Sequence, residues 1–182
     1  MNLAHDLAVL KAMAEALPTA LLAEGVFWPL GGPSDFPQLS VGMLLLTQAR
    51  LQAAEVALTP AQRTERDAAE RAGEITLARW PVAAENKAAH ELRVRLNSWA
   101  AFLQDCREAS AADVWPSAVT HRAIAALLLQ RFPHLAESAE ALRLPALDAA
   151  LRTYLRPGPF VWAVVYQTGF PPEAFWFLYA KP

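Results

Sequence analysis

The sequence predicts an all-α protein, a compact helical bundle of about five to seven helices. The first observation is the segment from Trp80 to Cys106, whose apolar residues recur at intervals of four and three, as on a long amphipathic helix. The second is the segment from Pro116 to Phe132, which has a similar period and is apolar around most of its circumference. The alternation typical of β-strands is scarce, so we expect strand only near the C-terminus.

The N-terminal part begins with an expected helix from about Asn2 to Leu17, where leucines are spaced by four and three until Pro18 ends the pattern. A loop rich in glycine, proline and aromatic residues follows over residues 19–36. We expect it to pack over one end of the bundle, and a lid over a pocket is the functional alternative.

A second helix is expected from about Pro37 to Leu58. Thr59 and Gln62 then have the spacing of a capping box, which predicts the start of a third, mostly polar and solvent-exposed helix. Gly73 is placed where that helix would end.

The fourth helix is the segment from Trp80 to Cys106, with a kink expected at Pro81 if the helix begins earlier. The fifth, from Pro116 to Phe132, is expected to be the most buried. Weaker helical patterns follow over residues 135–143 and 145–155.

The segment 157–182 is rich in proline and aromatic residues, so we expect it to wrap the bundle in an extended conformation, with a short strand or turn near its end. Residues 1–182 are accordingly expected to form a single helical domain.

Charge and composition exclude several classes of function. The 16 basic and 18 acidic residues are dispersed, so a nucleic-acid partner is not expected. No apolar run reaches membrane-spanning length and no secretion signal is apparent, so we expect a cytoplasmic protein with no membrane partner. The single cysteine, Cys106, cannot form an intrachain disulfide.

Four residues form the candidate ligand-binding site: Glu91, Arg95 and Trp99 on the fourth helix and His121 on the fifth. Glu91 and Arg95 are one turn apart near the apolar stripe, so we expect an ion pair there, and an anchor for an anionic ligand is the alternative. His121 projects with apolar neighbours, which indicates a hydrogen-bonded core residue more than a catalyst.

No catalytic residue, metal site or cofactor is predicted. The chain has no Glu-x-x-His or His-x-x-x-His pair, no cysteine cluster, no phosphate-binding glycine loop and no Gly-x-Ser-x-Gly elbow. Cys106 lies on the apolar stripe, where a thiol behaves as a small hydrophobic group.

The predicted function is therefore non-catalytic. Three features favour association, either as a homodimer or with a protein partner. They are the row of leucines on the first helix, the hydrophobic fraction of 54% and the aromatic C-terminal segment. The alternative is a small-molecule binding protein or enzyme whose pocket lies between the fourth and fifth helices, lined by the four candidate residues.

Overall fold

The computed structural model describes residues 3–107 and 111–182 and confirms the all-α class. The described residues hold seven α-helices, short 3-10 turns and one pair of two-residue strands. The contacts divide the chain into two compact units, unit 1 (residues 1–91) and unit 2 (residues 92–182), with the boundary inside one long helix. The expected single domain stays a prediction.

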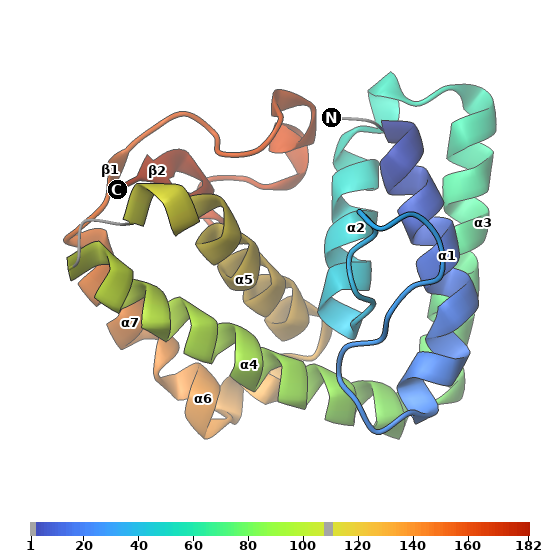
Figure 1. The fold of residues 1–182 in the computed structure, drawn as a ribbon, viewed down its shortest axis with the longest axis horizontal. Coiled ribbons are helices and arrows are strands. Elements are labelled where there is room, and N and C mark those ends of the chain that lie inside the picture. The colour runs from blue at the N-terminus through green and yellow to red at the C-terminus, as the bar shows by residue number, and fades with distance from the viewer. Residues whose placement is uncertain (1–2, 108–110) are drawn as a thin grey trace. The chain divides into compact units, whose positions relative to one another are not determined.

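Unit 1 is built from α1 (Leu3–Leu22), α2 (Val41–Ala53), α3 (Pro60–Arg79) and the first part of α4 (Pro81–Arg107), with a 3-10 turn at Glu55–Ala57. Helix α1 packs against both α2 and α3, and the three lie side by side in Figure 1. Their apolar faces meet in a core that includes Leu7, Leu10, Met13, Leu17, Leu44, Leu46 and Leu51.

Helix α1 differs from the prediction at its C-terminal end. Pro18 lies inside it, and the helix continues to Leu22. A proline removes one backbone hydrogen bond from a helix, but the extra turn buries Ala20 and Leu21 in the core of unit 1. The predicted start at Asn2 lies outside the described residues. The leucines spaced by four and three on the first helix pack inside the protein, because Leu7, Leu10 and Leu17 are all buried.

Helix α2 begins four residues after the predicted Pro37. Its N-cap is Ser40, whose hydroxyl accepts a hydrogen bond from the Met43 amide at 3.2 Å. The preceding loop is fixed by an antiparallel bridge in which Trp28 and Leu39 exchange backbone hydrogen bonds. Helix α2 ends at Ala53, before the predicted Leu58.

Helix α3 begins with the predicted capping box. The Thr59 hydroxyl accepts from the Gln62 amide at 3.2 Å, and the Gln62 side chain accepts from the Thr59 amide at 2.9 Å. The predicted end at Gly73 is wrong, because the helix runs on to Arg79 and buries Gly73 against α2. The expected kink at Pro81 is instead a break between two helices, with Trp80 as the C-cap of α3.

Unit 2 contains the rest of α4, then α5 (Ala111–Arg131), α6 (Ala139–Leu142) and α7 (Leu144–Arg152), with a 3-10 turn at Pro133–Glu137. Helix α5 begins five residues before the predicted Pro116, which the helix accommodates in its interior. The periodic stripe of α4 and the apolar face of α5 supply much of the buried core of this unit, including Leu96, Trp99, Phe102, Val119, Ile124 and Leu128.

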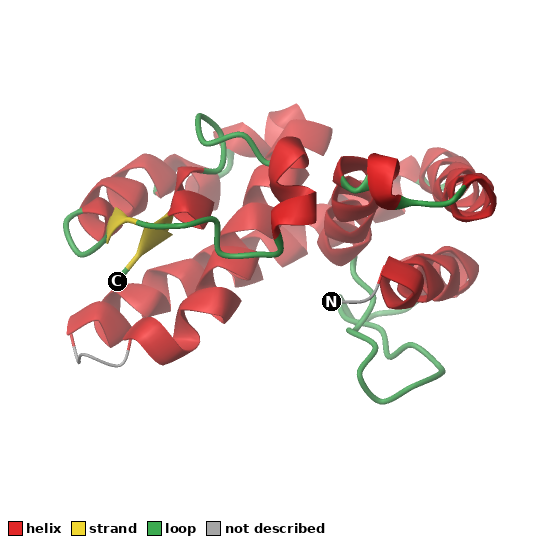
Figure 2. Cartoon of the chain, turned by 90° about the horizontal axis from the view of Figure 1, so that it is seen from above, coloured by secondary structure: helices red, strands yellow, loops and turns green. Residues whose placement is uncertain are grey.

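The C-terminal segment is an integral part of unit 2, as predicted. Strands β1 (Arg156–Pro157) and β2 (Ala180–Lys181) pair antiparallel, and they appear in yellow beside the C-terminus in Figure 2. Between them the chain forms 3-10 turns at Val164–Gly169 and Trp176–Tyr179, so it is less extended than predicted. Its rings fill the core, where Phe170, Phe175 and Phe177 are buried.

Candidate functional site

Glu91 is fully buried at the N-terminus of α2. Its carboxylate accepts a hydrogen bond of 2.6 Å from the Ser40 hydroxyl and one of 2.7 Å from the Gly42 amide. Because the Ser40 hydroxyl also accepts from the Met43 amide, the carboxylate, the cap and the first turn form one network. A negative charge here complements the positive end of the helix dipole, so these contacts hold α2 and α4 together within unit 1.

Arg95 and His121 are brought together in unit 2. The Arg95 guanidinium, which can only donate, lies 3.1 Å from Nδ1 of His121, so Nδ1 is the acceptor and the ring is the neutral tautomer with its proton on Nε2. Burial, and then the positive charge of Arg95, lower the pKa of His121 to about 4. At neutral pH His121 is therefore uncharged and accepts a hydrogen bond from Arg95.

Trp99 is fully buried, and its indole N–H donates to Asp148 of α7 at 2.9 Å. The same carboxylate receives a two-pronged contact from Arg122 of α5, Nε to Oδ1 at 3.1 Å and Nη2 to Oδ2 at 2.8 Å. The Arg122 guanidinium also lies over the Phe177 ring, 4.9 Å from its centroid. Trp99, Arg122 and Asp148 thus join three helices of unit 2.

Arg122 and Asp148 were missed by the sequence analysis, although a signal exists. Each interrupts an apolar helical face with a charge, Arg122 one turn after Ala118 and Asp148 one turn after Leu144. A buried charge requires an opposite partner, so two such interruptions of opposite sign indicate a pair.

The four predicted site residues therefore divide between the units. Arg95, Trp99 and His121 belong to unit 2, where Arg95 contacts His121 and Trp99 contacts Asp148. Glu91 belongs to unit 1. Its expected pairing with Arg95, and the ligand site as a whole, stay predictions.

Three cavities lie away from these residues. One of about 380 Å³ runs between α1 and α3 in unit 1, and one of about 220 Å³ lies beside β1 and β2 in unit 2. A third, of about 10 Å³, adjoins Lys87, whose ammonium donates to the carbonyls of Ala23 and Gly25 after the end of α1. None of these three cavities is lined by a predicted site residue.

Two observations bear on covalent and metal chemistry. Burial, and then the charge of Asp105, raise the pKa of the Cys106 thiol, which disfavours the reactive thiolate. Within residues 3–107 and 111–182, no group of three or more His, Cys, Asp or Glu side chains is placed to hold a metal ion.

Comparison of the chain with models of protein families, with curated proteins and with solved structures gives no match. Among the helices of the described segments, none combines the length and the apolar character that crossing a membrane requires.

Proposed function

We propose that this protein acts non-catalytically, in the cytoplasm, as a homodimer formed through the exposed face of α1 and α3. The observation that carries the proposal is that both helices present small and apolar side chains to solvent along one shared face. The buried polar contacts support the non-catalytic part. The side chains of Glu91, Trp99 and Asp148 all form hydrogen bonds with other residues of the chain.

The two helices run parallel, and the ion pair between Lys11 Nζ and Glu65 Oε2 at 2.9 Å shows which residues lie side by side. At about 100° per residue, six positions of each helix fall within an arc of about 80° that includes this pair. On α1 they are Ala4, Ala8, Lys11, Glu15, Pro18 and Leu22, and on α3 they are Ala61, Glu65, Ala68, Ala72, Ile75 and Arg79. We call these twelve residues the α1–α3 face.

The middle of the α1–α3 face is hollow, and one of its ends is apolar. Alanines of both helices line the cavity of about 380 Å³ between them. Beyond the cavity, Leu22 and Ile75 are 64% and 63% exposed, so this end adds apolar area next to the alanines. Small residues also let a facing helix approach closely.

A second copy complements this face in charge. If two copies of α3 pair antiparallel about Ala72, Glu65 of each copy faces Arg79 of the other, since both lie seven residues from Ala72. Each end of the interface then holds Lys11, Glu15 and Glu65 from one copy and Arg79 from the other, two positive and two negative charges. The same end of a single copy has an uncompensated negative charge.

The area of the face also suits a dimer. Each helix has 20 residues and is therefore about 30 Å long and about 10 Å wide, so the two present about 600 Å². Two copies would bury about 1,200 Å² in total, the lower limit for a specific and stable interface.

Analytical ultracentrifugation or native mass spectrometry tests the proposal. The wild-type chain is expected at twice its mass of 19.9 kDa at micromolar concentration. Ala72→Glu places two carboxylates at the two-fold axis and should yield monomers, whereas Ala78→Glu, at an exposed position on another face of α3, should not. A wild-type monomer, or a dimer that tolerates Ala72→Glu, contradicts the proposal.

A charge exchange tests the pairing itself. Arg79→Glu should weaken the dimer, because Glu65 of the second copy then faces a like charge. Glu65→Arg should also weaken it, and it sets a second cation beside Lys11 of the same chain, so it is the reference for the double variant. The double variant should associate more tightly than Glu65→Arg alone, because its reversed charges are again opposite across the interface. If the double variant is as weak as the single ones, the antiparallel register is wrong.

A further inference from the structure

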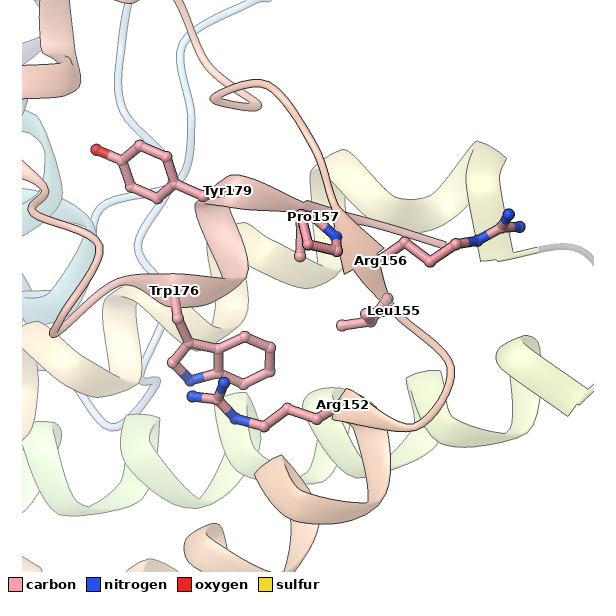
Figure 3. A pocket seen from close by; sticks show the side chains of 7 residues that line it. Arg152, Leu155, Arg156, Pro157, Trp176 and Tyr179 are labelled. Atoms are coloured by element: carbon pink, nitrogen blue, oxygen red, sulfur yellow. The ribbon is translucent and has the colours of Figure 1, made fainter.

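A surface pocket of unit 2 has the features of a ligand site that the proposed dimer does not use. It has a volume of about 220 Å³ and lies between the end of α7, the strand pair and the turn at Trp176–Tyr179. Seven residues line it: Arg152, Leu155, Arg156, Pro157, Trp176, Tyr179 and Ala180 (Figure 3).

Arg152 is held in place by an aromatic ring. Its guanidinium carbon lies 3.7 Å from the centroid of the Trp176 ring, and Figure 3 shows the group against the indole. A guanidinium stacked in this way leaves its N–H donors free at the edge of its plane. Over residues 3–107 and 111–182 the structure places no carboxylate in an ion pair with Arg152, so those donors are available to an anion.

The remaining walls of the pocket are largely apolar. Leu155, Pro157 and the Trp176 ring lie around the space. Tyr179 also lines the pocket, but its ring points away from the Trp176 ring in Figure 3, and its hydroxyl donates to the Phe170 carbonyl at 2.8 Å. Sites for drug-sized ligands occupy about 300–1,000 Å³, so this pocket fits a smaller molecule. One planar cation beside a small apolar space is complementary to a carboxylate with a short apolar or aromatic body.

We propose that this pocket binds a small organic carboxylate. Arg152 donates hydrogen bonds to the carboxylate group, and the apolar walls contact the rest of the ligand. Carboxylates match the fork of a guanidinium with two parallel hydrogen bonds, and stacking on Trp176 reduces the entropy lost on binding. Inorganic phosphate would satisfy the guanidinium but leave the apolar walls uncovered. The body of the ligand thus supplies the selectivity.

Arg143 provides a matched control outside the pocket. It is the N-cap residue of α7, its side chain is exposed, and it does not line the pocket. Arg143→Gln therefore removes the same charge as Arg152→Gln, from a side chain in the same unit that the ligand does not contact.

The experiment is a titration of the full chain with benzoate, followed by the NMR signal of the Trp176 indole N–H, which a Trp176→Phe variant identifies. We expect saturable shifts with benzoate, and much weaker ones with benzamide, the uncharged analogue, and with inorganic phosphate. Arg152→Gln should weaken benzoate binding about tenfold or more, and Arg152→Lys should retain only part of the wild-type affinity. Arg143→Gln should change the affinity by about twofold or less.

Three results would overturn the assignment. The first is the absence of a saturable benzoate shift at millimolar concentrations. The second is equal binding of benzoate and phosphate, which would indicate a general anion effect at exposed arginines. The third is an equal loss of binding in Arg152→Gln and Arg143→Gln. Thermal melting of each variant checks that the fold is retained, which is expected because both side chains are exposed.

Discussion

Arg95 donates a hydrogen bond to Nδ1 of His121, and this contact requires the histidine to be neutral. The imidazole therefore cannot accept a proton without losing its partner and facing a positive charge instead. Burial and Arg95 together lower the pKa of His121 to about 4 in the folded protein, against about 6.5 in an unfolded chain.

The first prediction follows from this difference. The unfolded chain binds the proton first, so the contribution of His121 to stability is complete above about pH 6.5 and is lost as the pH falls toward 4. The loss should be about 1–2 kcal/mol, allowing for partial exposure of the ring. Urea unfolding at pH 7 and pH 4.5 should show a smaller pH effect in His121→Gln than in the wild type. His90→Gln, at an exposed position of α4, should behave as the wild type does.

Asp148 should be important for the stability of unit 2. Asp148→Asn leaves the Arg122 guanidinium buried without a countercharge and weakens the bond to Trp99, so the free energy of unfolding should fall by about 3 kcal/mol. Asp113→Asn, at an exposed position of α5, should change it by less than about 0.5 kcal/mol. Chemical denaturation measures both.

A double variant distinguishes the cost of an unpaired charge from a general loss of packing. Arg122→Met combined with Asp148→Leu removes both charges, and it should be more stable than Asp148→Asn alone, because no charge is left unpaired. If the double variant is the less stable one, the apolar contacts of these side chains outweigh their pairing.

Gly73→Ala should stabilise the protein. A Cβ added at Gly73 would lie 3.6 Å from Gln48 Nε2 and 3.8 Å from a Leu44 methyl, both ordinary contact distances. Because Gly73 is in the middle of α3, alanine should raise the free energy of unfolding by about 0.5–1 kcal/mol through its helix propensity. Gly32→Ala should have the opposite effect, since Gly32 has a φ of 130° and its added Cβ would lie 3.3 Å from the Phe36 ring. Thermal melting distinguishes the two.

Local patterns in the sequence were sufficient for some elements and misleading for others. The periodicity of α4 and the capping box at Thr59 depend on neighbours within a few residues, and both predictions are confirmed. Pro18 and Gly73 are also local signals, but the helices continue through them because each extended helix buries further side chains against its neighbours.

The contacts of the candidate site could not be predicted in the same way. Asp148 is 26 residues from Arg122 and 49 from Trp99, and Glu91 is 51 from Ser40, so each pairing depends on how separate helices pack. Sequence periodicity indicates that a residue faces the interior, as it did for His121, but it does not identify the partner that it meets there.

The last prediction concerns removal of the C-terminal segment. A chain ending at Arg156 loses the β1–β2 pair, the hydrogen bond of 2.9 Å from the Trp115 indole to the Ala180 carbonyl, and the buried rings of Phe170 and Phe177. Each ring contributes about 1.5–3 kcal/mol by burial, so these two rings alone supply about 3–6 kcal/mol, a large part of the roughly 5–15 kcal/mol by which an ordinary domain is stable.

Residues 1–156 should therefore aggregate or lose the cooperative melting of unit 2, as followed by size-exclusion chromatography and circular dichroism. Phe177→Ala is the milder version, with an expected loss of about 3–5 kcal/mol from the cavity it leaves beside Trp99. Val164→Ala, at a 74% exposed position of the same segment, should have little effect. A truncated chain that stays soluble and melts as the full chain does would mean that α4, α5 and α7 form a sufficient core without these rings.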